Sequence, residues 1–178
     1  MTTRRRGGYN STALAFLNFA MDTQLGIFSR HFQKLHDKSV ALVEMLSDAQ
    51  LFEKPRPIDR SMAMFSCGEY VLRSGAAVEQ TFGGITTRLW DDPFEWTLPE
   101  KLSTRGLVIE YLHEVDATRR NAFGFFKSDE DLLKQIPAPE RIRPIVDLLL
   151  ETLSRAEHFQ GRAFAVFQMV SDAKLPRI

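Results

Sequence analysis

The chain has 178 residues, enough for one domain with a proper hydrophobic core and no need of disulfide bridges. Hydrophobic residues make up 44% and charged residues 26% of the sequence, which are the proportions of an ordinary soluble globular protein. Lysine plus arginine and aspartate plus glutamate number 23 each, so the formal net charge is zero. This balance excludes a general nucleic-acid binder, which needs surplus cations to displace counterions from phosphates.

Two further features of the sequence bear on where the protein works. Cys67 is the only cysteine, so the chain cannot form an internal disulfide. No segment approaches the roughly 20 consecutive apolar residues that span a bilayer, so no membrane partner is expected. Residues 1–22 carry basic residues before an apolar run, as a signal peptide does, but Asn18 and Asp22 interrupt that run. We therefore expect residues 1–22 to form a flexible, in part helical, arm and the protein to be cytoplasmic.

The first two predicted helices come from residues that recur every three or four positions. The first covers about residues 24–46, and the second covers about residues 67–89. Between them, Pro55 and Pro57 cannot continue a helix. The recurring positions are Phe28, Phe32, Leu35, Ser39, Leu42 and Leu46 in the first helix and Val71, Gly75, Val78, Phe82 and Ile85 in the second.

A long connection and two more helices follow. Residues 90–103, WDDPFEWTLPEKLS, are long enough to cross over a bundle end. The third helix begins near Ser103 or Thr104, either of which can cap it, and runs to about residue 126. A short helical turn is expected at Ser128, and the fourth helix runs from Pro144 to about residue 171. No segment alternates apolar and polar residues as a strand does, so we expect no sheet.

These elements predict an all-α protein, a four-helix bundle with a long crossover between the second and third helices. Their order and spacing resemble those of the DinB-like (YfiT-like) family of metal-dependent four-helix-bundle proteins. The likeness covers about residues 24–170 and implies a single DinB-like domain over residues 23–178. The similar segments are GIFSRHFQKLHDKSVALVEMLSDAQLFEKP for the first helix and its exit, VLRSGAAVEQTFGGITTRLW for the second helix and LSRAEHFQGRA for the fourth.

The resemblance implies a metal site built from three histidines, one on the second helix and a pair four residues apart on the fourth. Two imidazoles at that spacing leave one helix face, and three nitrogens leave an open coordination position. This chain departs from the pattern at each ligand, because the corresponding positions are Ser74, Arg155 and Phe159. Arginine keeps its proton and phenylalanine has no donor atom. We therefore predict no metal, with zinc or nickel as the alternative if other residues supply the ligands.

The four histidines do not restore the site by sequence alone. His158 points nearly opposite to the inward stripe of the fourth helix, which indicates a surface residue. His31 and His36 lie five residues apart and so point in different directions, about 140° apart around a helix. HEVDA at His113 has the opening of a zinc-protease motif but lacks its second histidine, so we interpret the match as chance.

Five residues are candidates for a pocket that remains where the metal site would be: Ser74, Glu79, Arg155, Phe159 and Gln160. Arg155 either pairs with Glu79 and partly replaces the charge of the metal, or lies at the boundary with its stem over apolar surface. Gln160 lies on the inward stripe and is expected to form hydrogen bonds within the bundle. Cys67 is interpreted as a buried structural residue.

Three functions remain open at this point. The first is a metal-free protein that binds a small molecule or a partner in the remnant pocket, and this is the one we favour. The second is a metal-dependent thiol S-transferase, an activity that the resemblance implies. The third is a purely structural or interaction bundle. The 14 phenylalanines indicate a core or a pairing face, the resemblance implies a homodimer, and Trp90 and Trp96 are expected to cover the core rather than to wall a pocket.

Overall fold

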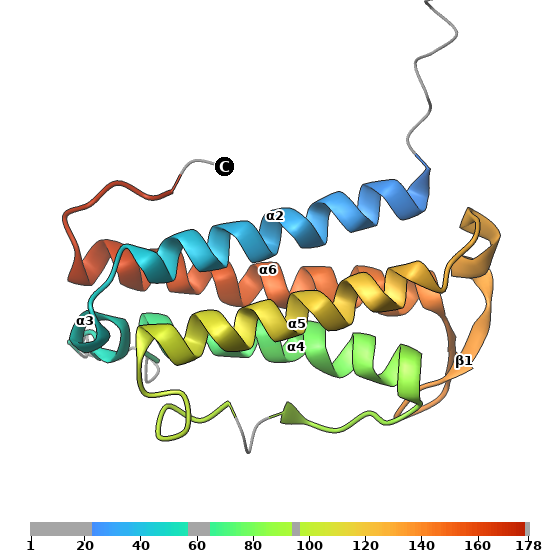
Figure 1. Ribbon diagram of the computed structural model, residues 1–178, viewed down its shortest axis with the longest axis horizontal. Coiled ribbons are helices and arrows are strands. Elements are labelled where there is room, and N and C mark those ends of the chain that lie inside the picture. Colours follow the sequence, from blue (N-terminus) through green and yellow to red (C-terminus); the bar gives the residue numbers. More distant parts are fainter. Residues whose placement is uncertain (1–22, 57–64, 94–96, 177–178) are drawn as a thin grey trace, which may run out of the picture.

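The computed structural model describes residues 23–56, 65–93 and 97–176, and four long helices account for most of them (Figure 1). They are α2 (Gln24–Glu44), α4 (Cys67–Thr87), α5 (Arg105–Gly124) and α6 (Ile145–Val170). Each predicted long helix is therefore confirmed and ends within a turn of the expected residue. The predicted N-terminal arm and Trp96 lie outside the described residues.

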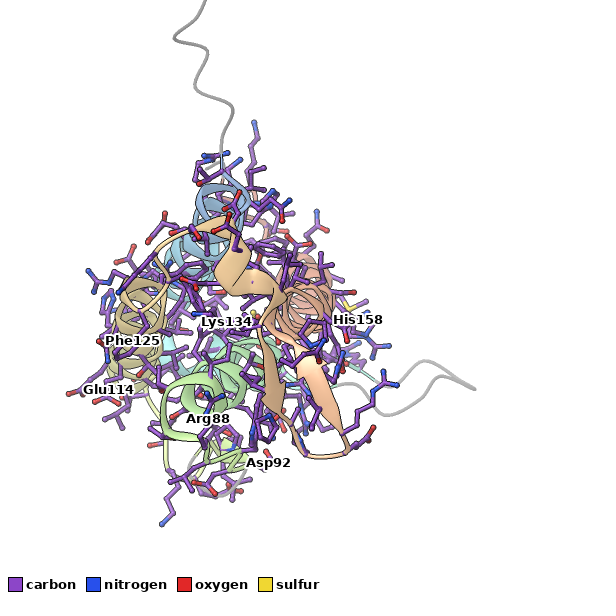
Figure 2. All side chains as sticks on the ribbon, turned by 90° about the vertical axis from the view of Figure 1, so that its right-hand side faces the viewer. Arg88, Asp92, Glu114, Phe125, Lys134 and His158 are labelled. Carbon is purple, nitrogen blue, oxygen red and sulfur yellow. The ribbon has the colours of Figure 1, made fainter. Side chains whose placement is uncertain are left out.

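The helices form a bundle in which α4 packs on both α5 and α6, and α2 packs on both α5 and α6. Figure 2 looks along this bundle, with the side chains filling the space between the helices. In Figure 1, α4 and α5 run in the same direction, so the connection between them, described for residues 88–93 and 97–104, returns along the bundle. The long crossover is thus confirmed. At its far end, the backbone N–H of Arg105 donates to Asp48 Oδ1 at 2.8 Å, which ties α5 to the short helix α3 (Asp48–Phe52).

Polar side chains set the points where the helices begin. Thr23 caps α2 by accepting a hydrogen bond from a backbone N–H of its first turn, and Thr104 does the same for α5. Ser66 and Glu69 form a reciprocal capping box at the start of α4. Of the two predicted caps for the third helix, Thr104 is therefore the one that is used.

The prediction of no sheet is wrong in one place. After the 3-10 helix η2 (Asp129–Leu133), strands β1 (Gln135–Pro137) and β2 (Ile142–Pro144) pair as an antiparallel hairpin. Three-residue strands are too short to show alternation in a sequence. The hairpin is held by its fit to the bundle, because Ile136 of β1 is buried while its neighbours are exposed. η2 confirms the helical turn expected after Ser128.

Aromatic packing closes the core as expected. Phe32 of α2 meets Phe82 of α4 edge to face, with ring centroids 5.0 Å apart. The half-buried Trp90 indole packs against the core over Gly84, and its Nε1 donates to the Pro137 carbonyl at 3.1 Å. Trp90 therefore covers the core, as predicted. Among the residues described, no helix is long and apolar enough to cross a membrane.

Candidate functional site: a groove between α4 and α6

Two of the five predicted site residues hold the helices together inside the bundle. Ser74 is buried on α4 and donates from Oγ to the Ala156 carbonyl of α6 at 2.9 Å. Gln160 is buried on α6, and its Nε2 donates to the Leu35 carbonyl at 2.7 Å and to Ser39 Oγ at 2.8 Å. The prediction that Gln160 forms hydrogen bonds within the bundle is confirmed. The donors of both side chains are thus used in contacts between helices.

The ion pair considered between Arg155 and Glu79 is not formed. The Tyr111 hydroxyl of α5 donates to Glu79 Oε2 at 2.6 Å, and burial, with this carboxylate beside it, raises the pKa of Tyr111. Arg155 is exposed, and its Nη2 donates to Gln80 Oε1 at 3.0 Å. Neighbouring residues on a helix point about 100° apart. Glu79 therefore faces α5 while Gln80 faces α6, and it is Gln80 that Arg155 reaches.

The centre of the bundle is nearly solid at the place where a remnant pocket was predicted. Ser74 and Gly75 border a space of about 20 Å³ between α2, α4 and α5. A volume of that size has room for about one water molecule. The predicted pocket beside Ser74 is thus filled by side chains, and any larger ligand needs another place to bind.

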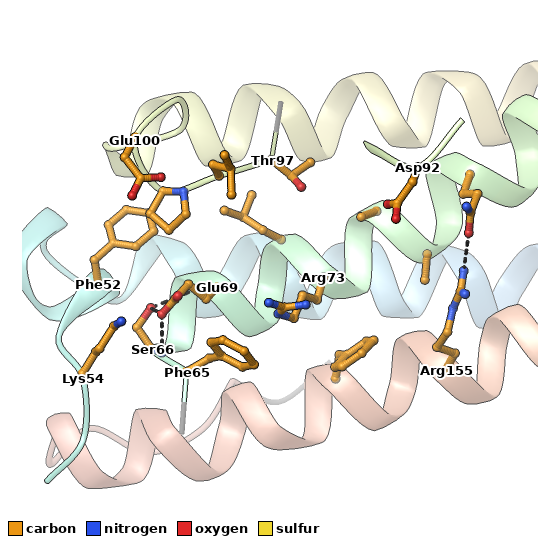
Figure 3. Close-up of a pocket in the computed structure, with 17 residues that line it drawn as sticks. Phe52, Lys54, Phe65, Ser66, Glu69, Arg73, Asp92, Thr97, Glu100 and Arg155 are labelled. Atoms are coloured by element: carbon orange, nitrogen blue, oxygen red, sulfur yellow. Dashed lines mark hydrogen bonds between the residues drawn. The ribbon is translucent and has the colours of Figure 1, made fainter. Parts of the chain in front are cut away.

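A groove of about 560 Å³ lies instead on the outer side of α4, between α4 and α6 (Figure 3). The end of α3, the approach to α4 and residues 97–100 of the crossover complete its walls. Arg155 and Phe159 are the two predicted site residues that line it. Its apolar walls are Phe52, Phe65, Leu72, Ala76, Ala77, Leu98, Pro99 and Phe159, and its charged side chains are Lys54, Glu69, Arg73, Asp92, Glu100 and Arg155.

Two arginines face this groove with most of their donors available. The Arg73 guanidinium lies over the Phe65 ring, 4.0 Å from its centroid, in a cation–π contact. Arg155 is held by the single hydrogen bond to Gln80. Within the described part of the chain, neither Arg73 nor Arg155 forms an ion pair with a carboxylate. Glu69, by contrast, is occupied, because its Oε2 accepts from the backbone N–H and the hydroxyl of Ser66, both at 2.8 Å.

Sequence reasoning missed most of this groove, although one signal for it was present. Glu69, Arg73, Ala76 and Gln80 recur at spacings of four, three and four residues, so they share one face of α4. That face is separate from the inward stripe through Val71 and Val78, and it was not treated as a surface of its own. The contribution of the crossover depends on how residues 97–100 fold back, which no spacing rule describes.

Cys67 and His158 are not among the residues that line the groove. Cys67 is fully buried with Sγ 3.5 Å from the Ala163 carbonyl, and burial raises its pKa to about 12, so it is a structural residue as predicted. His158 is exposed on the outer side of α6 (Figure 2). Across the described ranges, no group of three or more His, Cys, Asp or Glu side chains is arranged to hold a metal ion.

Comparisons with known proteins bear on the fold. No family model matches the chain, and no curated protein matches it. The crystal structure of a DinB-like protein from Bacillus cereus ATCC 10987 superposes on it with a TM-score of 0.67 at 14% sequence identity. The match covers 88% of this chain and 98% of that chain. The resemblance found in the sequence is thereby confirmed at the level of the fold, and the chain has the helical-bundle architecture of a DinB-like protein.

Proposed function

We propose that this protein binds a small amphipathic molecule, with an apolar body and one carboxylate or similar oxyanion, in the groove between α4 and α6. The observation that supports this most is the groove itself, whose volume of about 560 Å³ lies within the range of about 300–1,000 Å³ usual for ligand sites. Of the five predicted pocket residues, Arg155 and Phe159 line this groove and belong to the proposed site. Ser74, Glu79 and Gln160 do not line it and are not part of the proposed site.

The chemistry of the ligand follows from what the walls offer. Phe65, Phe159 and Leu72 supply apolar surface for the body of the molecule. Arg73 and Arg155 supply guanidinium donors, and guanidinium forms short, charge-assisted hydrogen bonds with carboxylates and phosphates. A neutral ligand would leave those donors in water without a charged acceptor. The proposal needs no metal in the groove and assigns no catalytic step to it.

The test is a panel of aryl and alkyl carboxylates, each paired with its uncharged primary amide, measured by thermal shift and by titration calorimetry on the full chain. We expect carboxylates to bind and to raise the unfolding temperature, because a ligand that binds only the native state stabilises it. Arg73→Gln and Arg155→Gln should each weaken binding about tenfold or more. Arg141→Gln, on an exposed turn remote from the groove lining, is the matched control and should bind as the wild type does.

A second variant removes the space instead of the charge. Ala76 is half-buried in the groove wall, so Ala76→Phe should fill the groove and abolish binding while α4 stays folded. Equal binding of each carboxylate and its amide would overturn the oxyanion assignment. If no member of the panel binds, or if binding survives Ala76→Phe unchanged, the groove is not the site. The homodimer and the cytoplasmic location stay predictions, to be tested by sedimentation velocity and cell fractionation.

A further inference from the structure

Two histidines that are far apart in the sequence meet across α2 and α5. The imidazole rings of His36 and His113 have their centroids 5.2 Å apart, with the ring planes at 52°. His36 is half-buried and His113 is exposed, so the pair lies at the surface edge of the seam between the two helices. Because α4 and α6 form the opposite seam of the bundle, the pair is remote from the proposed ligand groove.

The ring nitrogens of this pair are open to a ligand. Within the described part of the chain, neither His36 nor His113 takes part in a hydrogen bond or an ion pair. No buried side-chain nitrogen of a half-buried residue is left without a partner there, so the nitrogens of His36 are not sealed from solvent, and His113 is itself exposed. Most half-buried histidines hold their orientation through a hydrogen bond.

The spacing of the rings fits a shared metal ion. A zinc–nitrogen bond is about 2.1 Å long, and the centre of an imidazole lies about 1.1 Å behind its nitrogen, so two rings at a tetrahedral angle on one ion have centroids about 5 Å apart. The observed separation is 5.2 Å. The two rings therefore already lie at the separation that a shared ion requires.

The charges around the pair are compatible with a cation. Desolvation by burial lowers the pKa of His36, and the neutral imidazole is the form that binds a metal. The charged groups that act on it are Asp116 and Asp37, which favour a positive charge there, and Arg119 and His113, which oppose it. The influence of Asp116 is the largest of these four.

We propose that His36 and His113 together bind one divalent transition-metal ion of the kind that prefers imidazole, such as Zn²⁺, Ni²⁺ or Cu²⁺. Since the described residues provide no group of three ligands, water completes the coordination. The bound ion links α2 to α5 and stabilises the native chain. This inference stands apart from the proposed ligand groove, because it uses different residues on a different seam.

The experiment uses the untagged full chain. Because the sequence contains only four histidines, each of them can be tested by its own substitution. Titration with Ni²⁺ and with Zn²⁺, followed by calorimetry and by the unfolding temperature, should show one ion per chain and a rise in that temperature. His113→Asn changes an exposed residue and should weaken binding about tenfold or more and remove the rise. His31→Asn and His158→Asn should leave both unchanged.

Two further readings make the outcome unambiguous. Paramagnetic Ni²⁺ should broaden the ring-proton signals of His36 and His113 before those of His31 and His158. Sedimentation with metal should show no change in mass, because the ion is held within one chain. Binding that survives His113→Asn, equal broadening of all four histidines, or the absence of binding by the wild type would each overturn the proposal.

Discussion

The buried carboxylate of Asp116 offers a sharp test of how the seam between α2 and α5 is held. Its Oδ1 accepts from Arg119 Nε at 2.9 Å and Nη2 at 2.6 Å, while its Oδ2 pairs with Arg120 Nε at 3.0 Å. The two arginines differ in burial: the Arg119 side chain is 3% exposed and that of Arg120 is 66% exposed. Arg119 also reaches α2, where Gln33 Oε1 accepts from its Nη2 at 2.7 Å. The same acid thus has a buried and an exposed partner.

The expected magnitudes follow from this difference in burial. Asp116→Ala leaves the Arg119 guanidinium buried without its counter-ion, which costs about 3–5 kcal/mol of unfolding free energy. Arg120→Met removes an exposed ion pair and should cost less than about 1 kcal/mol. For a chain of this length, 1 kcal/mol corresponds to roughly 2–4 °C in the unfolding temperature. Asp116→Ala should therefore lower that temperature by about 6–20 °C, and Arg120→Met by less than about 4 °C.

The assay is urea unfolding at neutral pH, with thermal unfolding as a second reading. The double variant Asp116→Leu with Arg119→Met replaces the buried pair by apolar side chains and should recover much of the stability lost in Asp116→Ala. If Asp116→Ala and Arg120→Met cost the same small amount, Arg119 is not desolvated in solution and the seam is looser than the structure shows. If the double variant is no more stable than Asp116→Ala, the loss does not come from an uncompensated charge.

Three other predictions rest on single contacts. A Cβ at Gly84 would clash with the Trp90 ring, so Gly84→Ala should destabilise the protein by about 1–3 kcal/mol in urea unfolding. In Gly83→Ala the new Cβ meets only ordinary van der Waals contact, so this variant should be neutral or stabilising by up to about 1 kcal/mol. If both variants changed the unfolding free energy equally, the packing of Trp90 on Gly84 would be refuted. The Cys67 thiol should resist a disulfide reagent in the folded protein and react after unfolding, since its pKa is raised to about 12. A hydrogen bond from Lys134, together with backbone N–H groups, lowers the pKa of Asp131 to about 2. The ionised Asp131 should therefore contribute its full share of the unfolding free energy above about pH 4 and lose it as the pH falls toward 2. The difference in unfolding free energy between the wild type and Asp131→Asn should narrow over that window, and a constant difference would contradict this.

The four helices could be predicted because each local signal agrees with the packing. Positions such as Phe32 and Phe82 recur at helical spacing, and the same residues meet in the core. Thr104 caps α5 as its side chain predicts. The hairpin could not be predicted, because Ile136 gains its burial only from the folded bundle. Local patterns therefore describe this fold except where three-residue strands depend on distant partners.

The site was harder to predict. The sequence indicates on which side of its own helix a side chain lies, but it does not indicate which neighbouring helix that side faces. Ser74 and Gln160 point inward as expected, yet inward positions in this bundle are filled and hydrogen-bonded. Arg155 was expected to pair with Glu79 or to lie at the boundary; it is exposed, and its partner is Gln80, one residue and about 100° away from Glu79. The meeting of two histidines across α2 and α5 likewise depends on which helices are neighbours, and one sequence does not contain that information.

A bundle of four helices has four seams, and a closed centre leaves the seams as the places where ligands bind. The groove lies beside the seam between α4 and α6, and residues 97–100 of the crossover form one of its walls. The seam between α2 and α5 is closed by Arg119, which spans it from Asp116 to Gln33. A ligand in the first seam and an ion at the second share no side chain, so their binding free energies should add within about 0.5 kcal/mol. Titration of the carboxylate with and without Ni²⁺ measures this directly. A larger coupling would show that the packed centre transmits strain between the two faces.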